Sequence, residues 1–409
     1  MSNLQLEDYI VATYLVHGRG GDFHKKAQGI AVGLTVGSWT DLPAERQERM
    51  KKHLGHVVSV QELGSDEQGT VKALLKIAYP TINFTPDLPA VLTSVFGKLS
   101  MDGAIKLIDL DFPAEFTKNF PGPKFGIEGV RNRLGVQNRP LLMSIFKSCI
   151  GYDTDTLAEL FYQQALGGVD LVKDDEIFFD DTYAPFEKRI EACLKAADRA
   201  SAETGKKVLY AANLTAPVTE IVDKAKRAVQ AGANALLLNV LAYGYDVLHR
   251  LAADPEVNVP IMAHPALAGA LYPSPQYGIS APVVLGKLMR LAGADLVLYP
   301  SPYGSVAMER AETLAIAEEL RKPKEVLKPA FPVPSAGIHP GLVPQLYNDL
   351  GNDQVINAGG GIHGHPGGSA AGGRAFVAAI DAVIQGRTLE DAAKDSAELA
   401  KALELWGGK

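Results

Sequence analysis

Short apolar runs alternate with amphipathic stretches along the chain from about residue 140 onward. The apolar runs predict buried strands, and the stretches between them, such as 184–204 and 218–231, place their apolar residues on one helical face. The eight predicted strands are Leu141–Lys147, Val169–Lys173, Val208–Leu214, Ala235–Val240, Pro260–Ala263, Leu296–Tyr299, Phe331–Pro334 and Val355–Ala358.

Strands that alternate with helices pair in parallel, and eight such units in about 250 residues favour a (β/α)8 TIM barrel. An open, doubly wound sheet remains possible from periodicity alone. In a barrel the active residues lie at the carboxyl ends of the strands. The candidates at these ends are Lys147, the 173–176 group, His264, Ser335 and the Gly359–Gly361 run.

The first ~125 residues follow a different pattern, which predicts a small α+β domain of ferredoxin-like type. Its predicted strands are Ile10–Leu15 and Val71–Ala78, and its predicted helices are Ile30–Val36 and Leu88–Phe96. Pro121-Gly122-Pro123 breaks both helix and strand and marks a boundary. We therefore expect an N-terminal domain over 1–125 and a catalytic barrel over 126–409, with a closing helix over Leu389–Leu405.

The composition is that of a globular protein, with 47% hydrophobic residues and a net charge of -7. This charge disfavours a general role with nucleic acid or anionic membranes, because it provides no broad basic field. The chain has no apolar run long enough for a membrane span and no signal-peptide pattern at its start, so we expect it in the cytoplasm. Cys149 and Cys193 are too few for a disulfide framework and are expected as free thiols.

Gly167–Glu176, GGVDLVKDDE, places a lysine and three carboxylates at the end of a predicted strand. Strand alternation puts Lys173 and Asp175 on one side, and Glu176 can join them where the strand bends into its loop. An ammonium group has no lone pair, so Lys173 can bind a metal only after it reacts with carbon dioxide to form a carbamate. The group then suits Mg²⁺, which prefers hard oxygen ligands. The alternative is an acidic strand end in water, with Lys173 paired to a neighbour.

The glycine-rich loop Gly359–Gly361 follows the last strand, where barrels often bind phosphate through backbone amides. A flexible turn is an equally good interpretation of a lone glycine run. His363 and His365 lie two residues apart in this loop, but such histidines more often hold the loop through backbone hydrogen bonds than bind a metal. His264 ends the fifth strand and is better placed for chemistry.

Two further lysines are candidates. Lys147 ends the first barrel strand and could neutralise charge that develops on a substrate oxygen, although a surface lysine is equally consistent. Lys98 lies outside the barrel and could act as a general base if its surroundings depress its pKa.

Taken together, these segments resemble the RuBisCO large-chain family over nearly the whole chain. GGVDLVKDDE resembles the family's carbamylated-lysine motif, and PSAGIHPG and the Gly359–Gly361 run resemble its loops after strands seven and eight. The resemblance implies Mg²⁺ held by the Lys173 carbamate, Asp175 and Glu176. It implies substrate contacts from these residues and from a larger set: Lys147, Asp174, His264, Ser335, Gly337, Gly359 and Gly360.

Three departures from the carboxylases indicate a RuBisCO-like protein that adds no gas. Cys149 stands where carboxylases have a second lysine, and the loop Ser301–Met308 lacks their mobile lysine. Pro265 stands where they have an arginine for a second phosphate, which indicates a substrate with one phosphate.

Within the RuBisCO-like branch, GLTVGSWTDLP, FGKLSMDGAIKLIDL, LLMSIFKSCIG and PSPYGSVA resemble the enolases that tautomerise a phosphorylated diketone in methionine salvage. This resemblance implies that Lys98 removes the C1 proton. It also implies a homodimer in which Lys98 and Trp39 of one subunit reach into the barrel of the other. Two alternatives remain: a RuBisCO-like isomerase that acts on methylthioribulose 1-phosphate, and a non-catalytic sugar-phosphate-binding protein.

Overall fold

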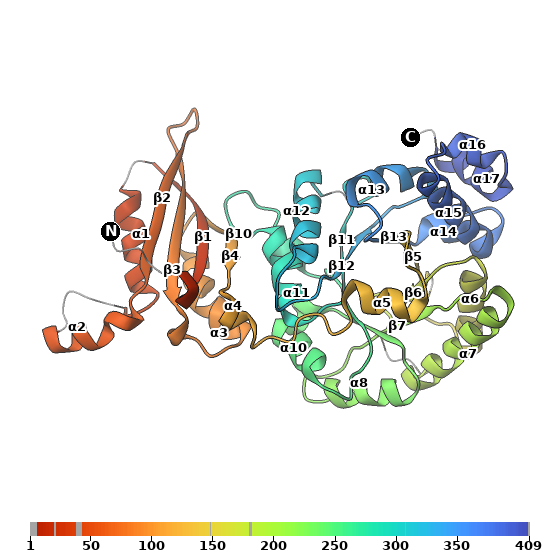
Figure 1. Cartoon of the computed structure of the whole chain (residues 1–409), viewed down its shortest axis with the longest axis horizontal. Helices are drawn as coiled ribbons and strands as arrows, with labels where there is room; N and C mark the ends of the chain where they lie inside the picture. Colours follow the sequence, from red (N-terminus) through yellow and green to blue (C-terminus); the bar gives the residue numbers. More distant parts are fainter. Residues whose placement is uncertain are drawn as a thin grey trace.

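The computed structural model describes residues 6–19, 22–37, 43–147, 149–179, 182–306 and 308–407. These residues fold around two sheets, which lie side by side in Figure 1. The first has five strands and the second has eight. Within the described residues, no helix is both long and apolar enough to cross a membrane.

The first sheet has the order β10-β4-β1-β3-β2. Its N-terminal strands are β1 (Tyr9–Gly18), β2 (His56–Ser65), β3 (Val71–Pro80) and β4 (Ile105–Asp111), which pair antiparallel. The two predicted strands in this region are confirmed as parts of β1 and β3. β2 and β4 were not predicted. Most side chains of β2 are exposed, so it lacks the apolar signal that marks a buried strand.

The helices that accompany the first sheet differ in part from the prediction. α1 covers Phe23–Gly33, so it overlaps the predicted Ile30–Val36 only at residues 30–33, and it is capped by the Asp22 side chain. α3 covers Leu88–Leu92 and continues as a π-helical turn over Thr93–Gly97, so the prediction of a helix there is confirmed. The other helices are α2 (Ala44–Met50) and α4 (Ala114–Thr117), with 3-10 turns at Leu6–Asp8, Lys51–His53, Thr81–Asn83 and Leu99–Met101.

The second sheet is a nearly closed parallel barrel, and all eight predicted strands are confirmed. They are β5 (Leu141–Ile145), β6 (Leu171–Lys173), β7 (Leu209–Asn213), β8 (Ala235–Leu238), β9 (Ile261–Ala263), β11 (Leu296–Pro300), β12 (Phe331–Ser335) and β13 (Val355–Ala358). β13 pairs with β5, and the sheet order ends at β12. β12 and β13 are joined by a hydrogen bond of 2.9 Å from Asn357 Nδ2 to Ser335 Oγ.

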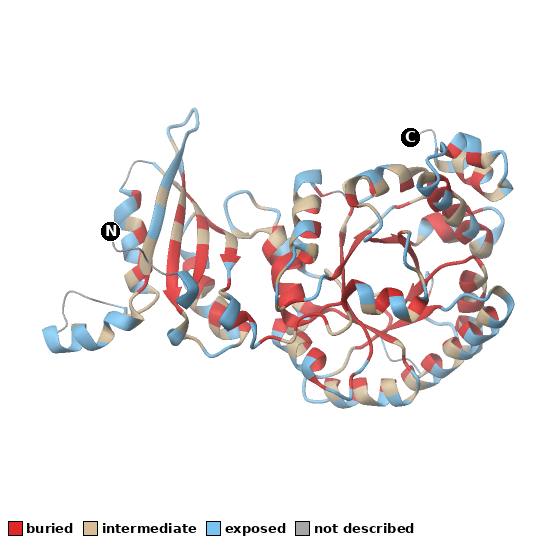
Figure 2. Ribbon diagram, viewed as in Figure 1, coloured by how far each residue is buried: buried red, intermediate tan, exposed pale blue. Residues whose placement is uncertain are grey.

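Helices surround this barrel, and Figure 2 shows buried residues on the strands and on the inward faces of the helices. The strands are buried on both faces, which explains their uniformly apolar sequences. The helices are α5 (Gly126–Leu134), α6 (Thr154–Leu166), α7 (Phe186–Thr204), α8 (Ile221–Gln230), α9 (Val240–Tyr243), α10 (Tyr245–Ala253), α11 (Leu288–Ala292), α12 (Arg310–Arg321), α13 (Val343–Leu350), α14 (Gly360–His363) and α15 (Gly368–Ile384). 3-10 turns cover Ala268–Ala270 and Pro340–Leu342, and a π-helix over Pro282–Lys287 leads into α11.

The prediction of one closing helix over Leu389–Leu405 is wrong. The segment forms two helices, α16 (Leu389–Ala393) and α17 (Ala397–Trp406). Ser396 caps α17 by accepting a hydrogen bond from the backbone N–H of Leu399, and this cap starts a new helix in place of a continuous one.

One short strand links the two sheets. β10 (Gly278–Ile279) lies in the segment after β9, yet it pairs in parallel with β4 of the first sheet. Lys106 of β4 donates hydrogen bonds to the carbonyls of Tyr272 and Ser274 in the same segment. The segment that follows His264 is therefore fastened to the N-terminal sheet.

Candidate active site

The carboxyl ends of the first two barrel strands meet through an ion pair. Lys147 Nζ, just beyond β5, lies 2.9 Å from Asp175 Oδ2, just beyond β6. Burial alone would raise the pKa of Asp175. The hydrogen bond and charge of Lys147, the N–H of Ile177 and the charge of Lys173 outweigh that effect and lower it. Asp175 is therefore ionised at neutral pH.

Lys173 is the last residue of β6, and its side chain is only 1% exposed. Its Nζ donates to the backbone carbonyl of Asp174 at 2.9 Å and lies 3.6 Å from Glu176 Oε2. Burial lowers the pKa of Lys173, although the nearby carboxylates oppose the shift. A buried amine with a lowered pKa is neutral more often than the amine of an exposed lysine. The neutral amine is the form that can attack carbon dioxide.

Asp174 faces away from its two acidic neighbours. Its carboxylate is fully buried and accepts hydrogen bonds from Arg189, from Tyr210 and from the backbone N–H of Asn213. The resemblance implied a substrate contact for Asp174, but this arrangement turns the carboxylate into the layer between β6 and α7. Asp174 therefore supports the segment that carries the other two carboxylates.

Asn213 holds the same segment from the end of β7. Its side-chain Nδ2 lies 3.3, 3.0 and 3.0 Å from the carbonyl oxygens of Asp175, Glu176 and Phe178. Sequence reasoning missed Asn213, although it is a polar residue at the end of a predicted strand, the position at which candidates were sought. Arg189 was missed because nothing in a helical pattern marks one arginine as buried.

His264 follows β9, and its Nε2 lies 3.4 Å from Glu176 Oε2. Its Nδ1 accepts a hydrogen bond from the backbone N–H of Ala266 at 3.2 Å, so the proton of a neutral ring lies on Nε2. Burial lowers the pKa of His264 to about 3, helped by the charge of Lys173. The contact with Glu176 is therefore made by a neutral imidazole N–H rather than by an imidazolium.

Of the glycine loops after β12 and β13, the one after β13 approaches the same group, and the one after β12 packs against the loop after β11. A Cβ added to Gly359 would lie 3.0 Å from Lys147 Cε, so Gly359 approaches the Lys147 side chain closely. Gly337 has φ of +75° and leaves no room for a side chain, because a Cβ would lie 2.5 Å from the backbone N of Ser305. Ser335 Oγ donates to the Val333 carbonyl and accepts from Asn357. Gly360 faces open space.

His363 and His365 hold the loop after β13, as predicted. His363 Nε2 lies 2.6 Å from the Ile145 carbonyl. His365 Nε2 lies 3.0 Å from the Glu398 carbonyl, and its Nδ1 accepts from Gly367 N–H. Cys149 and Cys193 are free, as predicted, and both are buried.

Lys98 lies apart from this group. It follows the π-helical turn Thr93–Gly97 in the N-terminal region, and its side chain is exposed. Together with Met101 and residues of α1, it borders a hollow of about 500 Å³. Among the described residues, no hydrogen bond or ion pair joins Lys98 to the barrel. Trp39 lies outside the described residues.

The side chains at this site suit a metal ion only if Lys173 is one of the ligands. Within the described ranges, no cluster of three or more His, Cys, Asp and Glu side chains is arranged to hold a metal ion. Asp175 and Glu176 lie at the strand end with Lys147, Lys173 and His264. A carbamate on Lys173 would supply the third anionic oxygen ligand and would make the set suitable for Mg²⁺.

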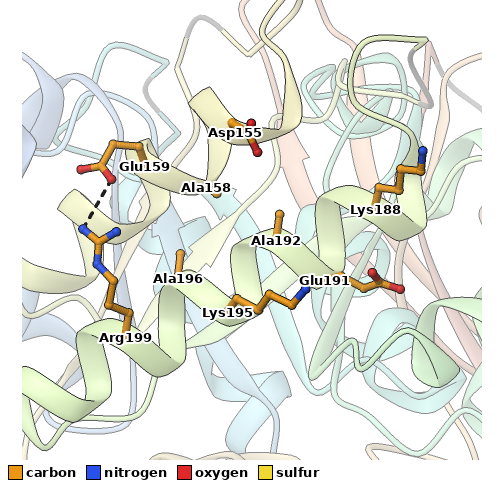
Figure 3. Close-up of a pocket in the computed structure, with 9 residues that line it drawn as sticks. All are labelled: Asp155, Ala158, Glu159, Lys188, Glu191, Ala192, Lys195, Ala196 and Arg199. Carbon is orange, nitrogen blue, oxygen red and sulfur yellow. Dashed lines mark hydrogen bonds and ion pairs between the residues drawn. The ribbon is translucent and has the colours of Figure 1, made fainter.

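A separate groove on the outer surface contains none of the candidate active-site residues. It runs between α6 and α7, and Figure 3 shows its floor of alanines bordered by charged side chains, including the Arg199–Glu159 ion pair. Both acidic and basic residues line it, which is typical of a solvated gap between two barrel helices.

The fold and this site define the class of protein. The family model described as ribulose bisphosphate carboxylase large chain, catalytic domain, matches residues 126–406, and the model of its N-terminal domain matches residues 3–116. The chain belongs to the ribulose bisphosphate carboxylase large-chain family.

Particular members of the family are highly similar to the chain. Proteins named 2,3-diketo-5-methylthiopentyl-1-phosphate enolase from Geobacillus kaustophilus and Bacillus licheniformis are both 57% identical to it, over 97% of this chain and 98% of theirs. The solved structure of a rubisco-like protein (MtnW) from Alicyclobacillus acidocaldarius has a TM-score of 0.94 and 55% identity, covering 98% of this chain and all of that one. A Rubisco from Pyrococcus horikoshii has a TM-score of 0.90 and 32% identity, covering 98% and 95%.

Proposed function

We propose that this protein is a 2,3-diketo-5-methylthiopentyl-1-phosphate enolase. It is an isomerase that converts this substrate to 2-hydroxy-3-keto-5-methylthiopentenyl-1-phosphate in methionine salvage. It acts in the cytoplasm. The observation that carries the proposal is the near full-length similarity to enolases of that name. The convergence of Lys147, Lys173, Asp175, Glu176 and His264 at one barrel mouth supports it.

The Lys173 carbamate, Asp175 and Glu176 would hold one Mg²⁺ per subunit. When bound, it supplies positive charge that stabilises the enolate oxygens of the reacting diketone. Carbon dioxide is needed as well as Mg²⁺, because Lys173 can offer an oxygen ligand to the metal only as the carbamate. The buried position of the Lys173 amine supports this modification.

The remaining residues bind the substrate and move its proton. Lys98 removes the C1 proton, Lys147 neutralises charge on a substrate oxygen, and the Nε2–H of His264 orients the substrate. Backbone amides of Gly337, Gly359 and Gly360 bind the single phosphate, beside Ser335. Asp174 holds Lys173 through its carbonyl rather than contacting the substrate.

The chain acts as a homodimer with shared sites. Lys98 is exposed on the N-terminal unit, proposed as residues 1–125, whereas the carboxylates lie in the barrel unit, proposed as residues 126–409. A base on one subunit can therefore serve the barrel mouth of its partner. Sedimentation at assay concentration tests this, since a fully active monomer would contradict it.

The decisive experiment follows enolisation of the diketone by ultraviolet absorbance, with and without Mg²⁺ and bicarbonate. We expect turnover that depends on both. Proton NMR of the product in D₂O separates this enolase from a RuBisCO-like isomerase acting on methylthioribulose 1-phosphate. Binding of the phosphate ester without turnover would favour a non-catalytic sugar-phosphate-binding protein.

A further inference from the structure

Arg189 is a fully buried cation that none of the proposed catalytic steps uses. It lies on α7, and its guanidinium is 4.0 Å from the ring centre of Phe178 and 5.5 Å from that of Phe186. Its hydrogen bonds go to the Tyr210 hydroxyl, the Ala184 carbonyl and the Asp174 carboxylate. A buried ion pair is weak evidence for a stabilising role, because apolar residues often replace such pairs without loss.

The contacts of Arg189 fall at both ends of the segment 174–178. At one end its Nη2 lies 3.0 Å from Asp174 Oδ2, and at the other its guanidinium stacks on Phe178. The segment turns between these two points, where the Phe178 N–H donates to the Asp175 carbonyl at 3.0 Å. Asp175 and Glu176 therefore lie in a turn that is held at each end by the same side chain.

The segment 174–178 needs the contacts from Arg189 because it carries three adjacent carboxylates. Arg189 neutralises Asp174 on the helix side of β6, and Tyr210 adds a hydrogen bond of 2.6 Å to the same carboxylate. Asp174 is thereby kept away from the barrel mouth, and its carbonyl stays 2.9 Å from Lys173 Nζ. Asp175 and Glu176 are left on the opposite side, toward Lys147 and His264.

We propose that Arg189 is a positioning residue that fixes the segment 174–178 through Asp174 and Phe178, so that Lys173, Asp175 and Glu176 are arranged to bind Mg²⁺. This inference rests on the metal site of the proposed function. Mutation of groups that orient metal ligands in this way typically lowers metal affinity by about 10–100-fold.

The test compares Arg189→Lys and Tyr210→Phe with the unsubstituted protein and with Arg199→Lys. Arg199 is on the same helix but its side chain is 55% exposed, so it controls for loss of an arginine on α7. Lysine keeps the charge at position 189 but loses the planar fork that bonds Tyr210, Ala184 and Asp174 together. Mg²⁺ affinity is measured by calorimetry in bicarbonate, the carbamate by NMR with ¹³C-bicarbonate, and folding by circular dichroism.

We expect Arg189→Lys to bind Mg²⁺ about 10–100-fold more weakly, with a smaller loss in Tyr210→Phe and none in Arg199→Lys. Raising Mg²⁺ by the same factor should restore much of the turnover, which a purely structural defect would not allow. Unchanged Mg²⁺ affinity in the folded variants overturns the inference. If Arg189→Lys does not fold, the Mg²⁺ affinity of Tyr210→Phe is the deciding measurement. If the unsubstituted protein binds no Mg²⁺, the metal site of the proposed function is itself wrong.

Discussion

Lys147 Nζ and Asp175 Oδ2 lie 2.9 Å apart, and this pair joins the ends of two neighbouring barrel strands. The two partners differ in exposure, since the side chain of Lys147 is 48% exposed and that of Asp175 is 10% exposed. Lys147 can therefore move toward a substrate, whereas Asp175 is held in place. The pair also means that a lysine compensates the charge of Asp175 when no cation is bound.

We expect Lys147→Met to separate substrate binding from metal binding. Loss of a charge-assisted hydrogen bond to the substrate oxygen should lower kcat/KM for the phosphorylated diketone by about 10–100-fold. Mg²⁺ affinity should stay the same or rise, because a competing cation has been removed from Asp175. Steady-state kinetics and calorimetry check the two expectations. A weaker Mg²⁺ affinity would show that Lys147 supports the metal site instead.

Lys98→Ala should lower kcat by about 10²–10⁴-fold, the usual contribution of a general base. The fold and Mg²⁺ affinity should not change, because Lys98 is exposed and lies apart from the carboxylates. Lys26→Ala is the matched control, since Lys26 borders the same hollow. Hydrogen–deuterium exchange at C1, followed by NMR, measures the step itself. Exchange at an undiminished rate in Lys98→Ala would assign the base to another residue.

Two neighbouring glycines should respond differently to alanine. Gly360 faces open space, so Gly360→Ala should fold normally, yet it should raise KM roughly tenfold if its amide approaches the phosphate closely. In Gly361→Ala the new Cβ would lie 2.2 Å from the Ile338 carbonyl oxygen, which should cost about 1–3 kcal/mol of stability. Thermal unfolding and KM measurements distinguish the two effects. A normal KM in Gly360→Ala would place the phosphate elsewhere.

The buried, neutral His264 should make stability depend on pH. Burial lowers its pKa from 6.5 to about 3, so below pH 6.5 the unfolded chain takes up a proton that the folded protein does not. Stability should therefore fall as the pH drops from 6.5, by about 2 kcal/mol at pH 5 from this residue. Urea unfolding at both pH values, in buffer without Mg²⁺ or bicarbonate so that Lys173 stays an amine, checks this against His264→Asn, which should lack that part of the loss. An equal loss in both proteins would mean that another group is responsible.

Much of the barrel could be predicted from the sequence because each buried strand is a continuous apolar run. The N-terminal region was harder to predict. Strand β2 is mostly exposed and mixed in polarity, so only its pairing with β3 identifies it as a strand. The end of the chain was predicted as one helix because its composition suits a helix throughout, whereas capping at Ser396 begins a second one.

The same division applies to the candidate site. The alternation of side chains along β6 already separates Lys173 and Asp175 from Asp174. No sequence pattern, however, identifies the partner of Asp174, because Arg189 lies on the next helix and Tyr210 on the next strand. Such contacts depend on how the helix packs against the sheet.

The sequence by itself therefore determined the family, the eight strands of the barrel and the residues that stand at the strand ends, since these follow from local periodicity and motif. Only the tertiary structure decided which of these residues meet. It turned Asp174 toward Arg189, and it brought Lys147 to Asp175 and His264 to Glu176. For Asp174 the physical reason is that a buried charge needs a partner, and that partner is set by packing between distant segments rather than by sequence spacing.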